Sequence, residues 1–232
     1  MTDRAALAAL TAEIVDCRRC PRLVEWRERV AREKVARHRD ETYWGRPVPG
    51  FGDPAARILV VGLAPAANGG NRTGRVFTGD RSGDFLFQGL FDAGLASSPI
   101  SRSRGDGLVL TGVRVAAVVR CAPPGNKPTI EERDRCIPYL ERELALLPEV
   151  RVIIALGAYA WDGALRVLAD LGQVIPRPRP RFGHGAEVPI GPYVLLGSFH
   201  PSQQNTFTGR LTEEMLLDVI NRARRVAEVE PA

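Results

Sequence analysis

Lysine is nearly absent from this chain of 232 residues: Lys34 and Lys127 are the only two, so arginine carries almost all of the positive charge. No stretch approaches the roughly 18 consecutive apolar residues that a membrane-spanning helix needs. The N-terminus MTDRAALAAL lacks the charged region followed by an apolar region that marks a secretory signal. We therefore expect a cytoplasmic protein with no membrane partner.

The chain also lacks the two commonest nucleotide-binding loops. Its glycine-rich stretch, RILVVGLAPAANGGNRTGRVFTGD over residues 57–80, fits neither GxxxxGK[ST] nor GxGxxG. The stretch still joins a buried strand to a polar loop, and ligands of open α/β sheets bind beyond the carboxyl ends of such strands. We expect a binding loop suited to an anion or a phosphate, with an ordinary crossover loop as the alternative.

Acidic residues are outnumbered, since the formal net charge is +5 and the isoelectric point is near 9.4. Residues 17–39 hold nine basic side chains against three acidic ones, with Trp26 among them. Arginine forks suit phosphate, so nucleic acid is a candidate partner. A solvated helix face is the other interpretation of this run, and an arginine-rich genome would also raise the arginine content.

Apolar runs and helical spacings alternate along the chain from residue 57 onward, which favours one parallel sheet with helices on both faces. We expect an α/β fold in a single domain, 1–232, made of an N-terminal helical and basic segment (1–56) and an α/β core (57–227). Residues 43–54, rich in proline, are expected to be a loop. The expected strands are 58–63, 113–119, 150–156 and 193–199, and the expected helices 1–16, 85–96, 129–147, 158–171 and 213–227.

The four cysteines fall in two pairs, Cys17 with Cys20 and Cys121 with Cys136. Disulfides are disfavoured in the cytoplasm, so two pairs of thiolates favour a metal site. Such a site would clip the N-terminal segment to the end of the second strand. Zinc and a four-iron cluster both accept four cysteines, and the spacing does not choose between them. Unrelated buried cysteines are the alternative.

Four stretches lie in the chain in a familiar order: the CxxC pair, GLAPAANGGNRTGRVFTGD, CAPPGNKPT with its later cysteine, and HPSQQN. Together they resemble the uracil-DNA glycosylase superfamily. Within it the chain looks most like the bacterial iron-sulphur group called family 5 or type B. The resemblance runs from residue 17 to about residue 211.

The resemblance implies a uracil-DNA glycosylase-like fold with a four-stranded parallel sheet, and a [4Fe-4S] cluster held by Cys17, Cys20, Cys121 and Cys136. It also implies hydrolytic removal of uracil, and of other deaminated bases such as hypoxanthine, from DNA. The substrate would be duplex DNA, or single-stranded DNA, bound by a monomer. Such an enzyme swings the nucleotide out of the stack, because the glycosidic bond is unreachable inside the duplex.

Three side chains match the family's site motifs. Phe77 matches the aromatic residue that stacks on the flipped base, with an ordinary core phenylalanine as the alternative. Asn126 matches the asparagine that reads the amide edge of the base, with a turn asparagine as the alternative. His200 matches the histidine of the HPS motif, which would hydrogen-bond the base as negative charge develops on it.

The residue that directs the water is less directly matched. Several superfamily members carry an acidic or amide side chain just inside the first motif, where this chain has an apolar run containing Ala64. We expect Asp80, in the FTGD pattern, to orient the water or to stabilise a positively charged sugar, with a helix-capping aspartate as the alternative. Asn68 and Asn71 are further polar candidates. Ala64 and Asn68 count among the expected substrate-binding residues.

The segment after the HPS motif is polar, where relatives insert a wedge into the duplex. Gln204 is expected to fill the vacated stack by hydrogen bonding to the opposite base. The rival to a glycosylase is a DNA-binding or sensing module whose cysteines hold zinc or a redox cluster. A phosphate-binding sugar-nucleotide enzyme is a third, weaker possibility, since the sequence offers no acidic metal or ribose site for it.

Overall fold

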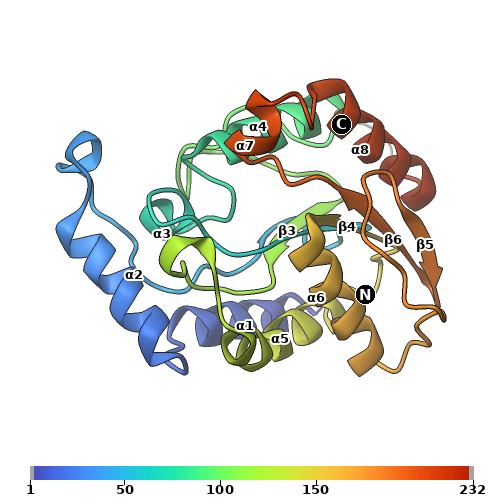
Figure 1. The fold of residues 1–232 in the computed structure, drawn as a ribbon, viewed down its shortest axis with the longest axis horizontal. Helices are drawn as coiled ribbons and strands as arrows, with labels where there is room; N and C mark the ends of the chain where they lie inside the picture. Colours follow the sequence, from blue (N-terminus) through green and yellow to red (C-terminus); the bar gives the residue numbers. More distant parts are fainter. Residues whose placement is uncertain (1–2, 230–232) are drawn as a thin grey trace.

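Four runs of aliphatic residues form the centre of a sheet in the computed structural model, which describes residues 3–229 (Figure 1). Every residue of β2, β3 and β4 is buried, as expected of parallel strands covered on both faces. The strand order is β1-β3-β2-β4-β6-β5. The strands are β1 (Phe51–Gly52), β2 (Ile58–Gly62), β3 (Val113–Ala117), β4 (Val152–Leu156), β5 (Glu187–Ile190) and β6 (Tyr193–Ser198).

The expected four-stranded parallel sheet is wrong as a description of the whole sheet, which has six strands and is mixed. The four expected strands are present and parallel to their neighbours, whereas β1 and β5 pair antiparallel at the two edges. β1 spans two residues inside the stretch expected to be a loop, and β5 contains Pro189. Edge strands tolerate proline and need no continuous apolar run, so both escape a pattern search.

The five expected helices are present, although α4 begins four residues before its expected start, and α2 (Pro21–Glu33) occupies the basic run for which a helix face was one of two interpretations. The expected capping box opens α5: the Thr129 hydroxyl accepts from the Glu132 N–H at 3.2 Å, and the Glu132 carboxylate accepts from the Thr129 N–H at 2.8 Å. Residues 1–2 of the first expected helix lie outside the described part. The helices are α1 (Arg4–Val15), α2 (Pro21–Glu33), η1 (Ala36–His38), α3 (Gly70–Thr73), α4 (Arg81–Asp92), η2 (Pro124–Asn126), α5 (Ile130–Ala145), α6 (Ala158–Asp170), α7 (Gln203–Phe207) and α8 (Glu213–Ala227).

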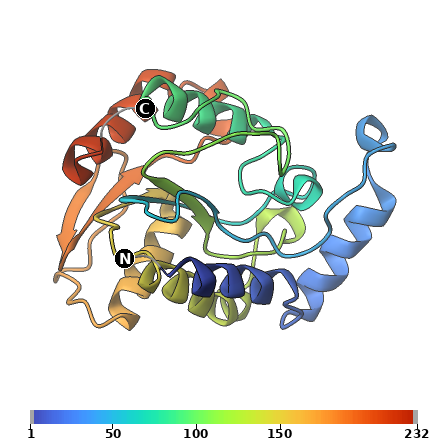
Figure 2. The ribbon, with the colours of Figure 1, turned by 180° about the vertical axis from the view of Figure 1, so that it is seen from behind.

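Helices cover both faces of the sheet, as expected (Figures 1 and 2). One hydrophobic core joins the sheet to α1, α5 and α6, with Leu10, Leu140 and Trp161 almost fully buried. The opposite core joins it to α4 and α8. α1 packs against α5, so the N-terminal segment shares a core with the sheet. The expected domain, 1–232, extends beyond the described residues at both ends.

The carboxyl ends of β2, β3 and β6 lie at one edge of the sheet, because these strands run parallel. The segments that follow them are the glycine-rich loop, the turn containing η2, and the segment that begins with His200. Segments far apart in the chain therefore meet at this edge. No helix within residues 3–229 has the length and the apolar character needed to cross a membrane.

Candidate active site and cysteine cluster

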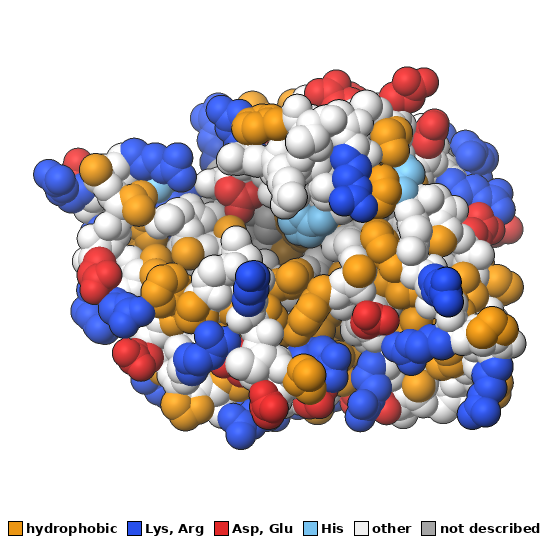
Figure 3. All heavy atoms as spheres, in the orientation of Figure 1, with side chains coloured by type: hydrophobic (Ala, Val, Ile, Leu, Met, Phe, Trp, Pro, Cys, Tyr) orange, Lys and Arg blue, Asp and Glu red, His pale blue; other side chains and the backbone are white. Residues whose placement is uncertain are grey.

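A cavity of about 300 Å³ opens at the carboxyl edge of the sheet. Figure 3 shows a hollow near the middle of this face, bordered by a histidine and an acidic side chain. Five of the expected site residues meet there, although they come from three separate segments of the chain. The cavity is lined by Leu63, Ala64, Ala66, Phe77, Asp80, Ser82, Asn126, His200 and Ser202.

Phe77 forms one wall of the cavity in a strained backbone conformation, with φ at +51°. A β-carbon at Gly62 would lie 2.6 Å from the Phe77 ring, and one at Gly83 would lie 1.9 Å from the Phe77 carbonyl oxygen. Both positions must therefore stay glycine for the ring to sit where it does. A residue held in this region costs about 1–3 kcal/mol, and such strain clusters at binding sites. Phe77 also belongs to the hydrophobic core, as the alternative expected, while stacking on a flipped base stays a prediction.

Asp80 both caps a helix and faces the cavity. Its Oδ1 accepts from the Gly83 N–H at 3.0 Å, which starts α4 at Arg81, four residues before the expected start. A β-carbon at Gly69 would lie 2.0 Å from Asp80 Oδ2, so glycine at this position makes room for the carboxylate. Burial raises the pKa of Asp80 above its ordinary value, and the Gly83 hydrogen bond only partly opposes this.

His200 follows β6 and faces the Phe77 ring, with ring centroids 5.7 Å apart and planes tilted by 36°. Its carbonyl oxygen accepts from Asn205 Nδ2 and from the Ser202 N–H, both at 2.8 Å, which holds the backbone of the turn. Burial lowers the pKa of His200 to about 4. The imidazole is therefore neutral near pH 7, with one N–H donor and one acceptor nitrogen.

Asn126 stands at the mouth of the cavity on η2, with its side chain exposed. Its φ is +57°, a conformation that asparagine adopts more readily than most residues. Gly125 before it is also left-handed, so the Pro-Gly-Asn turn is what turns this amide toward the cavity. Asn126 is therefore a turn asparagine, which was the alternative interpretation, and the same turn places its side chain at the cavity.

Two expected substrate-binding residues do not line the cavity. Asn68 Oδ1 accepts from the Tyr43 hydroxyl at 2.9 Å, so the side chain braces the loop. Gln204 is exposed on α7, outside the cavity. Asn71, the other polar candidate, is fully buried and donates from Nδ2 to the Arg27 carbonyl oxygen at 3.1 Å.

Sequence reasoning missed two serines on the cavity wall. Ser82 lies in the first turn of α4 and Ser202 is the N-cap residue of α7. Each hydroxyl adds a donor and an acceptor beside Asp80 and His200 respectively. The signal was available, because Ser82 follows directly on the FTGD pattern and Ser202 is the serine of the HPS motif.

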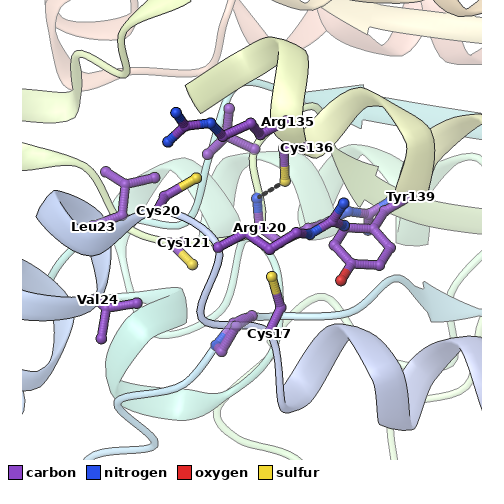
Figure 4. A pocket seen from close by; sticks show the side chains of 12 residues that line it. Cys17, Cys20, Leu23, Val24, Arg120, Cys121, Arg135, Cys136 and Tyr139 are labelled. Atoms are coloured by element: carbon purple, nitrogen blue, oxygen red, sulfur yellow. Dashed lines mark hydrogen bonds between the residues drawn. The ribbon is translucent and has the colours of Figure 1, made fainter. Parts of the chain in front are cut away.

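The four cysteines line one small cavity, where their sulfur atoms face a common space (Figure 4). Cys17 follows α1, Cys20 is the N-cap residue of α2, Cys121 follows β3 and Cys136 lies in α5. Two distant parts of the chain thus meet as the pairing predicts. Within residues 3–229, no three His, Cys, Asp or Glu side chains stand close enough to hold a single metal ion.

Two buried arginines border this cysteine site. Arg27 is 2% exposed and donates from Nη1 to Cys121 Sγ at 2.9 Å and from Nη2 to the Cys17 carbonyl oxygen at 3.2 Å. Arg120 is 1% exposed, and its backbone N–H donates to Cys136 Sγ at 3.3 Å. Arg27 Nε and Arg120 Nε and Nη1 have no acceptor among the described residues. The surroundings therefore suit a negatively charged group that brings further acceptors.

A buried ion triad supports the same region. Glu143 accepts from Arg114 Nε at 2.6 Å and from Arg120 Nη2 at 2.5 Å. Burial alone would raise the pKa of Glu143, but the charges of the two arginines hold it below its ordinary value. Since Arg120 precedes Cys121 and Glu143 shares α5 with Cys136, the triad fixes the second cysteine pair through protein contacts alone.

Comparison with known proteins gives one consistent answer. Residues 49–224 match the family model of the uracil DNA glycosylase superfamily. A type-5 uracil-DNA glycosylase of Thermus thermophilus is 54% identical over 228 residues, covering 98% of this chain and 99% of that protein. A type-5 uracil-DNA glycosylase of Mycobacterium bovis is 52% identical over 227 residues, covering 97% of this chain and 83% of that protein. One from Pyrobaculum aerophilum is 46% identical, covering 90% and 88%.

Proposed function

The chain belongs to the uracil-DNA glycosylase superfamily, and on that basis we propose that it hydrolyses the bond between uracil and deoxyribose in DNA, leaving an abasic site. The observation that carries the assignment is the meeting of Phe77, Asp80, Asn126 and His200 around one cavity. The product is free uracil, released into water.

The cavity binds the base after the nucleotide has left the stack. The Phe77 ring offers one face for stacking, and the exposed Asn126 amide pairs its donor and its acceptor with the amide edge of the base. Ala64 contributes only a methyl group to the cavity wall. The same features accept other deaminated bases that carry an amide edge, and we extend the proposal to hypoxanthine.

His200 stabilises the departing base. As the bond to C1′ breaks, its electron pair leaves with the base and negative charge spreads to a carbonyl oxygen. A neutral imidazole donates its N–H to that oxygen, and the pKa of about 4 keeps the ring neutral throughout the working range. The neutral His200 ring already carries the N–H that it donates, so it does not have to be protonated first.

Asp80 acts on the sugar side of the same bond. Its carboxylate faces the cavity, where it orients a water molecule toward C1′ and accepts the proton that the water loses. The same charge also stabilises the positive charge that develops on the sugar ring. Water adds to C1′ as the base departs, so no covalent intermediate with the protein is needed.

The four cysteines fit a [4Fe-4S] cluster, which we propose as the resident group of this site. Four sulfur donors face one space, and buried N–H donors of Arg27 and Arg120 have no acceptor among residues 3–229. A cluster here supplies cross-linking between the N-terminal segment and the α/β core. No step of the hydrolysis passes through it.

The assignment is tested by strand cleavage at alkali-labile sites in labelled duplexes that carry one uracil or one hypoxanthine. We expect wild type to excise uracil, and His200→Ala to lower the single-turnover rate about 10²–10³-fold, the usual effect of losing one such donor. Binding of the uracil duplex without excision by wild type would contradict the proposal and favour a DNA-sensing module.

A further inference from the structure

A second hollow, of about 440 Å³, adjoins the base cavity and shares Asp80 with it. It lies between the segment around η1, which projects at the upper left of Figure 1, the start of α4, and the loop over residues 97–107. We call it the arginine groove. It is lined by Arg37, His38, Arg72, Gly79, Asp80, Arg81, Asp84, Ile100, Ser101, Arg102 and Gln203.

Three exposed arginines reach the groove from three different segments: Arg37 from η1, Arg81 from α4 and Arg102 from the loop 97–107. Arg37 and Arg102 form no ion pair with any described residue. Arg81 lies over the Phe207 ring, with Cζ 5.2 Å from the centroid. The arginines that line the groove outnumber its two carboxylates, Asp80 and Asp84, so the net charge of the groove is positive.

The segments that carry these arginines are already held in place. Glu41 accepts from His38 Nδ1 at 2.5 Å and also pairs with Arg72, which ties the η1 segment to the glycine-rich loop. On the other wall, Arg75 Nη1 donates to Asp106 at 2.8 Å. Asp106 in turn accepts from the Arg102 N–H at 2.8 Å, so both walls are positioned before any ligand binds.

We propose that the arginine groove binds the phosphates of the damaged strand on one side of the flipped nucleotide. The inference rests on the proposed function, because Asp80 is the wall that the two hollows share. When the sugar of the flipped nucleotide lies at Asp80, the adjoining phosphate of the same strand enters the groove. Arginine forks match phosphate oxygens and stay charged at every working pH.

The rim of the groove also suits a nucleic-acid strand better than a free anion. Ile100 is 46% exposed on the groove wall, and Phe207 is 67% exposed beside Arg81. Exposed apolar and aromatic side chains next to a basic groove are where bases or sugars of a strand pack. The ligand class is therefore a phosphodiester chain, one or two nucleotides beyond the flipped one.

The first test measures binding of a duplex with a single abasic analogue as a function of salt concentration. Each lost phosphate contact reduces the slope of log K against log salt by about 0.7–0.9. We expect Arg37→Gln and Arg102→Gln each to weaken binding and to reduce the slope by that amount. The matched control is Arg177→Gln, an exposed arginine beyond the end of α6, at the opposite edge of the sheet.

The second test finds the side of the strand. Phosphates on the 5′ or the 3′ side of the uracil are replaced one at a time by neutral methylphosphonates. We expect wild type to lose affinity from replacements on one side, and the Arg37→Gln, Arg102→Gln double variant to be insensitive to those same replacements. If wild type and variants show the same salt dependence of binding and the same loss of affinity on methylphosphonate replacement, the proposal that the groove binds phosphate is wrong. Uracil excision by wild type would still stand in that case, whereas absence of excision would overturn the function itself.

Discussion

Asp80 affects the free energy of unfolding in two opposite ways. Its hydrogen bond to the Gly83 N–H stabilises the start of α4, whereas burying its charge beside the cavity disfavours the folded state. Asparagine caps helices about as well as aspartate does but carries no charge. The pair of substitutions to asparagine and alanine therefore separates the cap from the chemistry.

We expect Asp80→Asn to lower the excision rate about 10²–10⁴-fold, the usual contribution of a general base, while raising thermal stability at pH 7. Because the pKa is raised in the folded state, the cost of the charge is present at neutral pH and disappears as the pH falls below the unfolded pKa. The stability difference between wild type and Asp80→Asn should shrink accordingly on acidification.

Asp80→Ala is the matched control, since it also removes the cap. It should be as inactive as Asp80→Asn but less stable than it by about 0.5–2 kcal/mol. Thermal unfolding at pH 7 and at pH 4 measures both effects. Full activity of Asp80→Asn would assign Asp80 to capping alone.

For single residues, the sequence predicted the cavity residues that lie in motifs, and it failed for a residue whose position depends on tertiary packing. Phe77, Asn126 and His200 were found because each matches a motif of the family that the chain resembles, and all three line the cavity. Asn68 was placed at the substrate because it is polar and lies in the right loop. Its actual partner, the Tyr43 hydroxyl, comes from a segment that no periodicity links to it.

At the scale of elements, the Arg114, Glu143 and Arg120 triad holds β3, the turn after it and α5 in one arrangement. All three side chains are buried, so removing the central charge leaves two guanidinium groups uncompensated. This is the situation in which breaking a buried ion pair is strongly destabilising.

We expect Glu143→Gln to destabilise the fold by about 3–5 kcal/mol at pH 7 in urea unfolding. The effect should diminish as the pH falls, because a carboxylate with a lowered folded pKa contributes stability above its unfolded pKa and loses it on protonation. Glu13→Gln, which breaks an exposed pair with Arg142, should cost less than about 1 kcal/mol. Similar costs for the two variants would contradict the importance of the triad.

Element boundaries were predictable where local chemistry sets them. The Thr129 capping box and the apolar spacing of α8 are local signals, and both helices begin where expected. The edge strands β1 and β5 were missed because pairing with a neighbour, and not composition, makes them strands. Whether the sheet has edge strands, and whether they run antiparallel, therefore depends on tertiary contacts and not on local sequence.

For the whole molecule, the cysteine site lies where the first two helices meet the α/β core, and we propose that a cluster links the two parts there. We expect purified wild type to contain about four iron atoms per chain. Cys17→Ser should lose the broad visible absorption and unfold at a lower temperature, because the link that closes the long intervening loop is gone. Brief proteolysis should then cleave near residues 16–22 before the core.

The triad allows a control within the same protein. Cys17→Ser should leave the core cooperative, since Glu143 and its two arginines fix the second cysteine pair without a cluster. Iron measured by absorption and by elemental analysis checks the first expectation, and near-ultraviolet circular dichroism checks the second. Zinc in a colourless wild-type protein would refute the cluster assignment.

The order in which the cavity is assembled has a consequence during synthesis. Phe77 and Asp80 leave the ribosome before His200, which follows β6, the last strand in chain order among the described residues. A chain that ends before β6 lacks His200, the donor that we propose for the departing base. The cavity is therefore complete only when β6 has paired with β4 and His200 has taken its place beside Phe77.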